Sequence, residues 1–175
     1  MPTLTQTPVC PIDVSLLSPP RRAAVEEALS WIGTPYVDHA GIKYCGVDCA
    51  FFPLRVYQAA GKIQKDFNPP RYSPQQWLNS PRQVDKMKLR FEDKTFLNIV
   101  LSFSKREISE EEVQPGDFVI YKVVSSWTHG GVIIKWPEYV LHPIIGRGVI
   151  GSHGTKEGFL LSRPHRFFTV FDKGE

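Results

Sequence analysis

The sequence predicts one α+β domain in which helices come first and an antiparallel sheet follows. Apolar residues recur at helical spacing in the first part of the chain. After residue 117 the chain changes to short β-branched and aromatic runs separated by Gly and Pro, which is typical of antiparallel strands. The 175 residues suit a single domain over 1–175, because two domains would each be unusually small.

The first helix is expected directly after Ser18, and residues 1–17, which show no periodicity, are expected to form an N-terminal arm. Ser18 is the expected side-chain cap, and Pro19 and Pro20 follow it at positions where a missing N–H group does little harm. An apolar stripe with helical spacing comes next: Val25, Ala28, Leu29 and Ile32. Gly33 is expected to end this helix.

Two further helices and a loop are expected before the sheet. The second helix follows Cys49 and closes at Gly61. Its apolar positions are Phe52, Val56, Ala59 and Ala60. Residues 68–81 are rich in Pro, Ser, Gln and Asn and predict a surface loop, and a third helix is expected around 93–104. The expected strands are FVIYKV, GVIIKW, EYVLHP and RFFTVF.

Composition excludes several classes of protein. The net charge is +3 and the Lys and Arg residues are scattered, so nucleic acid is not an expected partner. No apolar run is long enough to predict a membrane span. The N-terminus lacks the charged start and apolar block of a signal peptide, so we expect synthesis in the cytoplasm. Three cysteines cannot all pair with one another, which argues against a disulfide scaffold.

Cys49 is the candidate nucleophile, because it lies where a loop becomes a helix. A thiol near a helix N-terminus feels the positive end of the helix dipole, which favours the reactive thiolate. Pro53 cannot donate the helical hydrogen bond to the Cys49 carbonyl, so a helix that begins nearer Phe52 would reduce this effect. On position alone, a nucleophile and an inert buried thiol are equally well supported.

A reactive cysteine needs a base, and His129 is the best placed histidine. It begins the strand-like run THGGVIIKW, and His142 ends the next run, EYVLHP. A tight turn at Trp136-Pro137 between two strands would put both histidines side by side. One imidazole would then act as the base, and the other would accept its second N–H and fix its tautomer. The alternative is that each histidine only hydrogen-bonds within the sheet. The remaining histidines lie in loop or edge contexts: His39, His153 and His165.

Two side chains near Cys49 have both functional and structural interpretations. Tyr36 follows the first helix and either supplies a hydroxyl to the site or packs its ring. Asp48 either caps the second helix or binds a substrate amine, and the cap alone would explain it.

A metal site is the competing interpretation of the same region. Cys45 and Cys49 could bind a metal together with His39 and His129, but structural zinc sites more often have a closer pair and a matching second pair downstream. A Cys45–Cys49 disulfide in an oxidising setting would abolish nucleophilic chemistry.

Five short motifs follow one another between residues 24 and about 150. They are a helix ending in Gly-Thr-Pro-Tyr, a Gly-Val-Asp-Cys segment that opens a helix, a Pro-Gly-Asp turn, a His-led strand and a second His about a dozen residues later. In this order they resemble the NlpC-type cell-wall cysteine peptidases. The loop FNPPRYSPQQW and the later GVIGS are similar to the phage-tail-associated and prophage branch of that family.

The resemblance implies a papain-like fold, with a cysteine-bearing helix packed on an antiparallel sheet that carries the histidines. It assigns Cys49 as the nucleophile, His129 as the general base and then acid, and His142 as the orienting residue. It places Tyr36 near the oxyanion and Asp48 at the substrate's amino end. The implied substrates are peptidoglycan stem peptides, cut next to D-glutamate and a diamino acid, and no cofactor is implied.

The chain departs from the family where Ala50 and Phe51 replace the usual Ser-Gly, with Pro53 soon after. These residues leave the nucleophile in place and bear on substrate specificity. They also motivate a catalytically inactive structural part of a phage or tail-like particle, with tail proteins as partners. An acyltransferase or amidase acting on a non-wall substrate is a third possibility. Without a signal peptide, the protein would reach the wall in a particle, by a non-classical export route or by lysis.

Overall fold

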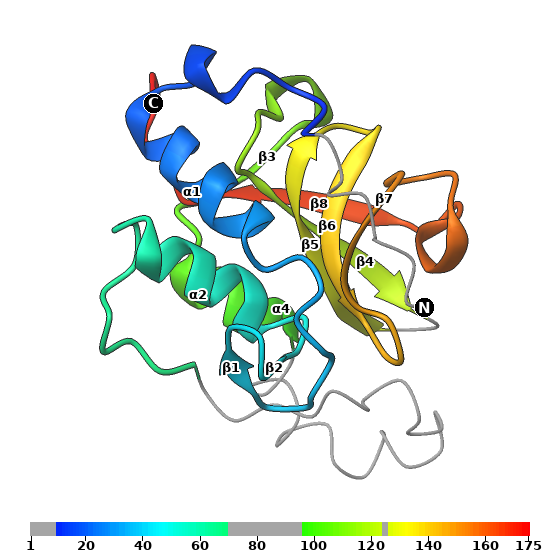
Figure 1. Ribbon diagram of the computed structural model, residues 1–175. Coiled ribbons are helices and arrows are strands. Elements are labelled where there is room, and N and C mark those ends of the chain that lie inside the picture. The colour runs from blue at the N-terminus through cyan, green and yellow to red at the C-terminus, as the bar shows by residue number, and fades with distance from the viewer. Residues whose placement is uncertain (1–9, 70–95, 124–125) are drawn as a thin grey trace, which may run out of the picture.

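The computed structural model describes residues 10–69, 96–123 and 126–175. In these ranges, helices α1 and α2 lie side by side and pack, with α4, against a six-stranded antiparallel sheet (Figure 1). Helices precede most of the strands along the chain, so the predicted α+β class with a segregated sheet is confirmed.

The three α-helices fall close to their predicted places. They are α1 (Pro19–Leu29), α2 (Phe51–Ala59) and α4 (Phe96–Phe103). Two details of the first helix were wrong. The Ser18 hydroxyl makes no cap bond: Pro19 and Pro20 have no N–H to donate, and the Arg21 N–H does not donate to it. The helix also ends at Leu29, so that Ile32 lies in the turn before Gly33, whose φ is +84°.

The part of the expected arm that the structure describes, residues 10–17, is packed onto the domain. It contains a single 3-10 turn, η1 (Val14–Leu16), and the Arg22 Nε of α1 donates to the Val14 carbonyl oxygen at 3.1 Å. Its apolar side chains that pack against the core are Cys10, Ile12, Val14 and Leu17. Residues 1–9, most of the loop predicted at 68–81 and the start of the helix predicted at 93–104 lie outside the described residues.

The main sheet has the strand order β3-β8-β4-β5-β6-β7. The strands are β3 (Arg106–Ile108), β4 (Phe118–Val123), β5 (Ser126–Lys135), β6 (Tyr139–Ile144), β7 (Gly148–Ser152) and β8 (His165–Thr169). The four predicted runs correspond to β4, β5, β6 and β8, whereas β3 and β7 were not predicted. A small hairpin of β1 (Gly41–Ile42) and β2 (Gly46–Val47) precedes α2, and the 3-10 turns η4 (Glu110–Glu112) and η5 (Gly158–Leu160) lie between strands.

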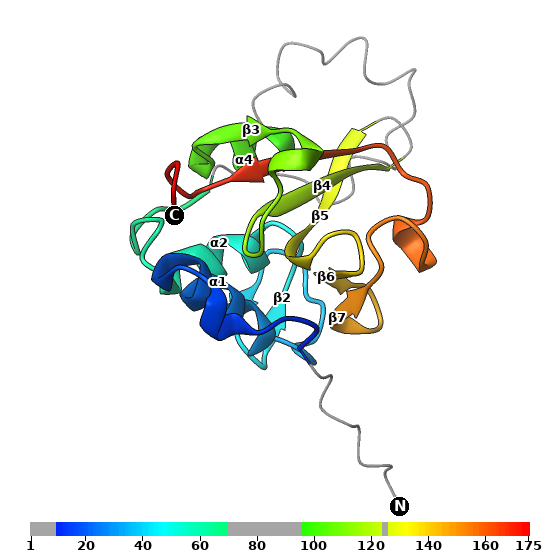
Figure 2. The same cartoon turned by 90° about the horizontal axis from the view of Figure 1, so that it is seen from above.

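The sheet is covered by apolar side chains on both faces. Phe118 and Ile120 of β4 belong to the larger cluster, which includes the helices, whereas Val119 and Tyr121 belong to a second cluster. Neighbouring residues of a strand point to opposite faces, so the second cluster lies on the face away from α1 and α2. Figure 2 shows the segment around η5 on that side of the sheet. Strand β5, between β4 and β6, therefore lies in the middle of the domain and carries His129.

Candidate active site

Cys49 lies between strand β2 and helix α2, where the backbone turns into the helix. Helix α2 begins at Phe51, and the first bond of its opening turn runs from the Phe52 N–H to the Asp48 carbonyl oxygen at 3.0 Å. Cys49 is thus just outside the helix, as Pro53 suggested. Pro53 is accommodated because it stands in the first turn of the helix, where proline is tolerated.

The Asp48 carboxylate caps this opening turn and ties it to the preceding loop. Its Oδ1 accepts the N–H groups of Ala50 at 3.0 Å and Phe51 at 2.9 Å, and its Oδ2 accepts the His39 N–H at 2.7 Å. The side chain is fully buried. The geometry therefore supports the cap interpretation directly, and a role in binding a substrate amine stays a prediction.

The Cys49 thiol is held in its neutral form. Burial is the main cause that raises its pKa well above the ordinary value, and the negative charge of Asp48 raises it further. The nearby Cys49 backbone N–H acts in the opposite direction and is outweighed. The thiol donates a hydrogen bond to the Thr128 carbonyl oxygen at 3.4 Å. The helix dipole thus does not produce a resting thiolate here.

Thr128 presents this carbonyl because it lies in a β-bulge. Tyr121 of β4 pairs with His129 and Lys122 pairs with Trp127, which leaves Thr128 as the extra residue of β5. Its carbonyl oxygen is therefore available to the cysteine rather than to the strand ladder. The thiol therefore contacts the backbone of the residue that directly precedes His129, the predicted base.

The two predicted histidines lie side by side on adjacent antiparallel strands. Nε2 of His129 on β5 is 2.9 Å from Nδ1 of His142 on β6, and the rings are nearly perpendicular, with centroids 5.1 Å apart. On its other side, Nε2 of His142 is 2.9 Å from Oγ of Ser152 on β7. The structure therefore confirms the predicted juxtaposition and adds Ser152, which lies on a strand that sequence reasoning did not find.

Both imidazoles are neutral near pH 7. Burial lowers the pKa of His129 well below its usual range, and the neighbouring His142 and Arg163 lower it further. Burial, with a smaller contribution from Arg147, lowers the pKa of His142 to about 4. Each ring then has one N–H to place. Among the described residues, Nδ1 of His129 has no hydrogen-bond partner, so it is the ring nitrogen left to take up a proton.

The segment around η5 covers His129. The Phe159 ring meets His129 edge to face at a centroid distance of 4.9 Å, and the Arg163 guanidinium stacks on Phe159 at 4.3 Å. Only 7% of His129 and 4% of Cys49 are exposed to solvent. Phe159 therefore covers the His129 ring on that side. The sequence contained no signal for this cover, because η5 lies beyond the motifs.

Tyr36 lies near the thiol but does not contact it in a hydrogen bond. Its backbone forms an isolated bridge with Val47, two residues before Cys49. Burial raises the pKa of Tyr36, and the negative charge that Cys49 would carry as a thiolate is the second cause. A hydrogen bond to Asp38 raises the pKa as well. The hydroxyl is thus within electrostatic reach of the cysteine, and its role at the oxyanion stays a prediction.

This chain resembles known proteins in its structure, at sequence identities below 20%. No protein-family model and no curated protein matches this sequence. An NlpC/P60 family protein from Bacillus cereus matches with a TM-score of 0.53 at 17% identity, over 83% of this chain and 39% of that chain. The chain has the NlpC/P60 fold.

Two proteins from Mycobacterium tuberculosis show that this fold occurs with and without catalysis. RipB, described as a peptidoglycan hydrolase, matches with a TM-score of 0.53 at 15% identity, over 91% of this chain and 71% of its own. RipD, described as a non-catalytic NlpC/p60 domain protein adapted to peptidoglycan binding, matches with a TM-score of 0.52 at 14% identity, over 89% of this chain and 100% of its own. This chain spans well under half of the Bacillus cereus protein.

The NlpC/P60 fold of this chain holds its three cysteines as free thiols. Cys45 is exposed and Cys10 half-buried, so neither shares the environment of Cys49. Within the described ranges, no group of three or more His, Cys, Asp or Glu side chains could hold a metal ion. None of the helices described is long and apolar enough to cross a membrane.

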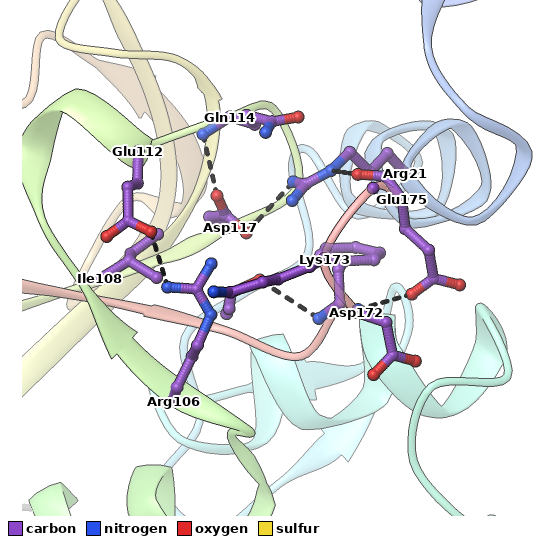
Figure 3. Close-up of a pocket in the computed structure, with 12 residues that line it drawn as sticks. Arg21, Arg106, Ile108, Glu112, Gln114, Asp117, Asp172, Lys173 and Glu175 are labelled. Carbon is purple, nitrogen blue, oxygen red and sulfur yellow. Dashed lines mark hydrogen bonds and ion pairs between the residues drawn. The ribbon is translucent and has the colours of Figure 1, made fainter.

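A cavity of about 230 Å³ lies away from Cys49, between strand β3 and the C-terminal residues. Two ion pairs join charged side chains of its lining: Arg21 with Asp117 at 3.1 Å and Arg106 with Glu112 at 2.8 Å (Figure 3). Neither cysteine nor histidine lines it.

Proposed function

We propose that this protein is a cysteine peptidase or amidase that hydrolyses amide bonds in peptidoglycan stem peptides. The observations that carry the proposal are the 2.9 Å contact between His129 and His142 and the hydrogen bond from the Cys49 thiol to the carbonyl oxygen of Thr128, the residue before His129. A neutral imidazole whose second nitrogen is held by a neighbour is suited to take a proton from a nucleophile. The presence of a described peptidoglycan hydrolase with the same fold supports the choice of substrate.

In the proposed reaction, the Cys49 thiol leaves the Thr128 carbonyl and gives its proton to Nδ1 of His129 as the sulfur attacks the amide carbon. The oxyanion that forms is held by the Cys49 backbone N–H and by the Tyr36 hydroxyl. His129 then protonates the leaving amine, which departs and leaves a thioester. Water adds to the thioester, gives one proton to His129 and releases the carboxylic acid product. The proton returns to the sulfur, so no cofactor is consumed.

The test is cleavage of purified muropeptides, followed by chromatography and mass spectrometry of the fragments. Cys49→Ala is expected to abolish turnover without unfolding the protein. Cys45→Ala, which changes an exposed cysteine, is expected to leave turnover unchanged. His129→Ala is expected to lower kcat by about 10²–10⁴-fold. His142→Ala is expected to lower kcat less, because His142 orients the base and does not transfer the proton. A larger loss for His142→Ala would reverse the two assignments.

The burial of the thiol favours a second candidate, a non-catalytic protein that binds peptidoglycan or forms part of a phage or tail-like particle. Cys49 is 4% exposed with a raised pKa, and RipD is an example of this fold without catalysis. This candidate predicts that wild type and Cys49→Ala bind insoluble peptidoglycan or tail proteins equally well and that neither releases fragments. An acyltransferase would instead transfer the acyl group to an added amine, which mass analysis of the products would detect.

A further inference from the structure

Ser152 is the polar end of a chain of hydrogen-bonding groups that crosses three strands. It is the last residue of β7, and in the ladder with β6 it pairs with Val140, while His142 pairs with Ile150. Its Oγ lies 2.9 Å from Nε2 of His142. The His142 side chain is fully buried and Ser152 is half-buried.

Two placements of the protons satisfy this chain when both imidazoles are neutral. In the first, Nε2–H of His129 donates to Nδ1 of His142, and Nε2–H of His142 donates to Ser152. In the second, the Ser152 hydroxyl donates to Nε2 of His142, whose Nδ1–H donates to Nε2 of His129. The second placement puts the remaining proton of His129 on Nδ1. A protonated Nδ1 has no lone pair with which to accept the proton of the Cys49 thiol. Only the first leaves His129 as a base.

We propose that Ser152 is a positioning residue that accepts the Nε2 proton of His142 and thereby keeps Nδ1 of His129 unprotonated, as a general base requires. This inference rests on the proposed cysteine hydrolase function. Removing the hydroxyl would leave the His142 Nε2–H buried with no acceptor in its place. His142 would then gain by placing its proton on Nδ1, which favours the inactive tautomer of His129. The positive charges of Arg147 near His142 and Arg163 near His129 disfavour an imidazolium at either position. Protonation of both nitrogens of one ring therefore does not offer an alternative to the change of tautomer.

The test compares Ser152→Ala and Ser152→Thr with Ser102→Ala, which removes an exposed hydroxyl on α4 that bonds only the local Ile99 carbonyl. In protein labelled with ¹⁵N-histidine, ¹H–¹⁵N spectra report which ring nitrogens carry protons. We expect Nε2–H signals for both His129 and His142 in wild type, Ser152→Thr and Ser102→Ala. In Ser152→Ala we expect the His142 Nε2–H signal to be lost and a His129 Nδ1–H signal to appear.

The kinetic counterpart is a fall in kcat of about tenfold for Ser152→Ala, with KM unchanged because the hydroxyl does not touch the substrate. Ser152→Thr is expected to restore kcat. Unchanged Nε2–H signals and unchanged kcat in Ser152→Ala would overturn the proposal, and so would a His129 Nδ1–H signal in wild type. The spectra do not depend on turnover. A wild-type protein that cleaves nothing but shows the expected tautomers would therefore refute the proposed hydrolase and leave the role of Ser152 standing.

Discussion

Replacement of Asp48 tests how the turn that holds Cys49 is stabilised. The carboxylate accepts three backbone N–H groups, from His39, Ala50 and Phe51, and is fully buried. Loss of an N-terminal cap lowers stability by about 1 kcal/mol. The Ala50 N–H is buried, and leaving it without an acceptor adds about 1–3 kcal/mol. Asp48→Ala should therefore lower the free energy of unfolding by about 2–4 kcal/mol.

Asp48→Asn is the conservative comparison. Its amide oxygen can still accept from Ala50 and Phe51, but its NH₂ group faces the His39 N–H, donor against donor. We expect a loss smaller than that of Asp48→Ala, measured by equilibrium urea unfolding followed by circular dichroism. Asp66→Ala removes an exposed carboxylate and should change stability by less than about 0.5 kcal/mol. If Asp48→Ala were as mild as this control, or Asp48→Asn as damaging as Asp48→Ala, the cap interpretation would be refuted.

Two further predictions concern the covered histidines. Unfolded histidine takes up a proton near pH 6.5 and folded His142 only near pH 4, so the free energy of unfolding should fall by about 3 kcal/mol as the pH is lowered through this window. Urea unfolding at several pH values should show a shallower slope for His142→Gln, and an unchanged slope would contradict the assignment. Phe159→Ala should uncover His129 and speed the modification of its imidazole by diethyl pyrocarbonate, followed by peptide mass spectrometry. The matched control Leu161→Ala, at a residue that is already 57% exposed, should not, and equal rates in both variants would show that Phe159 is not the cover.

Local sequence patterns were sufficient to predict much of the fold and the core of the site. Apolar residues at helical spacing predicted α1 and α2. The short β-branched and aromatic runs after Asp117 predicted four of the strands. Pro53 indicated that the helix begins after Cys49, because the constraint is covalent and local. The pairing of His129 with His142 could be predicted because a short turn between two strands forces them to be antiparallel neighbours.

What the sequence did not reveal depends on packing between distant segments. Ser152 bonds His142 only because β7 returns beside β6, and β7 reads as a short Gly-containing run with little strand signal. Phe159 covers His129 through a turn on the far face of the sheet. The neutral state of Cys49 likewise follows from burial, which outweighs the helix dipole and has no local signature.

The central claim is that Cys49 attacks the substrate with the help of His129, and the most direct test is to look for the thioester. The protein, with its other two cysteines replaced by serine, is mixed with a purified stem peptide, quenched in acid and analysed by intact mass spectrometry. The account predicts a mass increase equal to the acyl half of the peptide, located on Cys49 and absent in Cys49→Ala and in His129→Ala. Peptide cleavage without this adduct, or neither cleavage nor adduct in the wild-type protein, would contradict it.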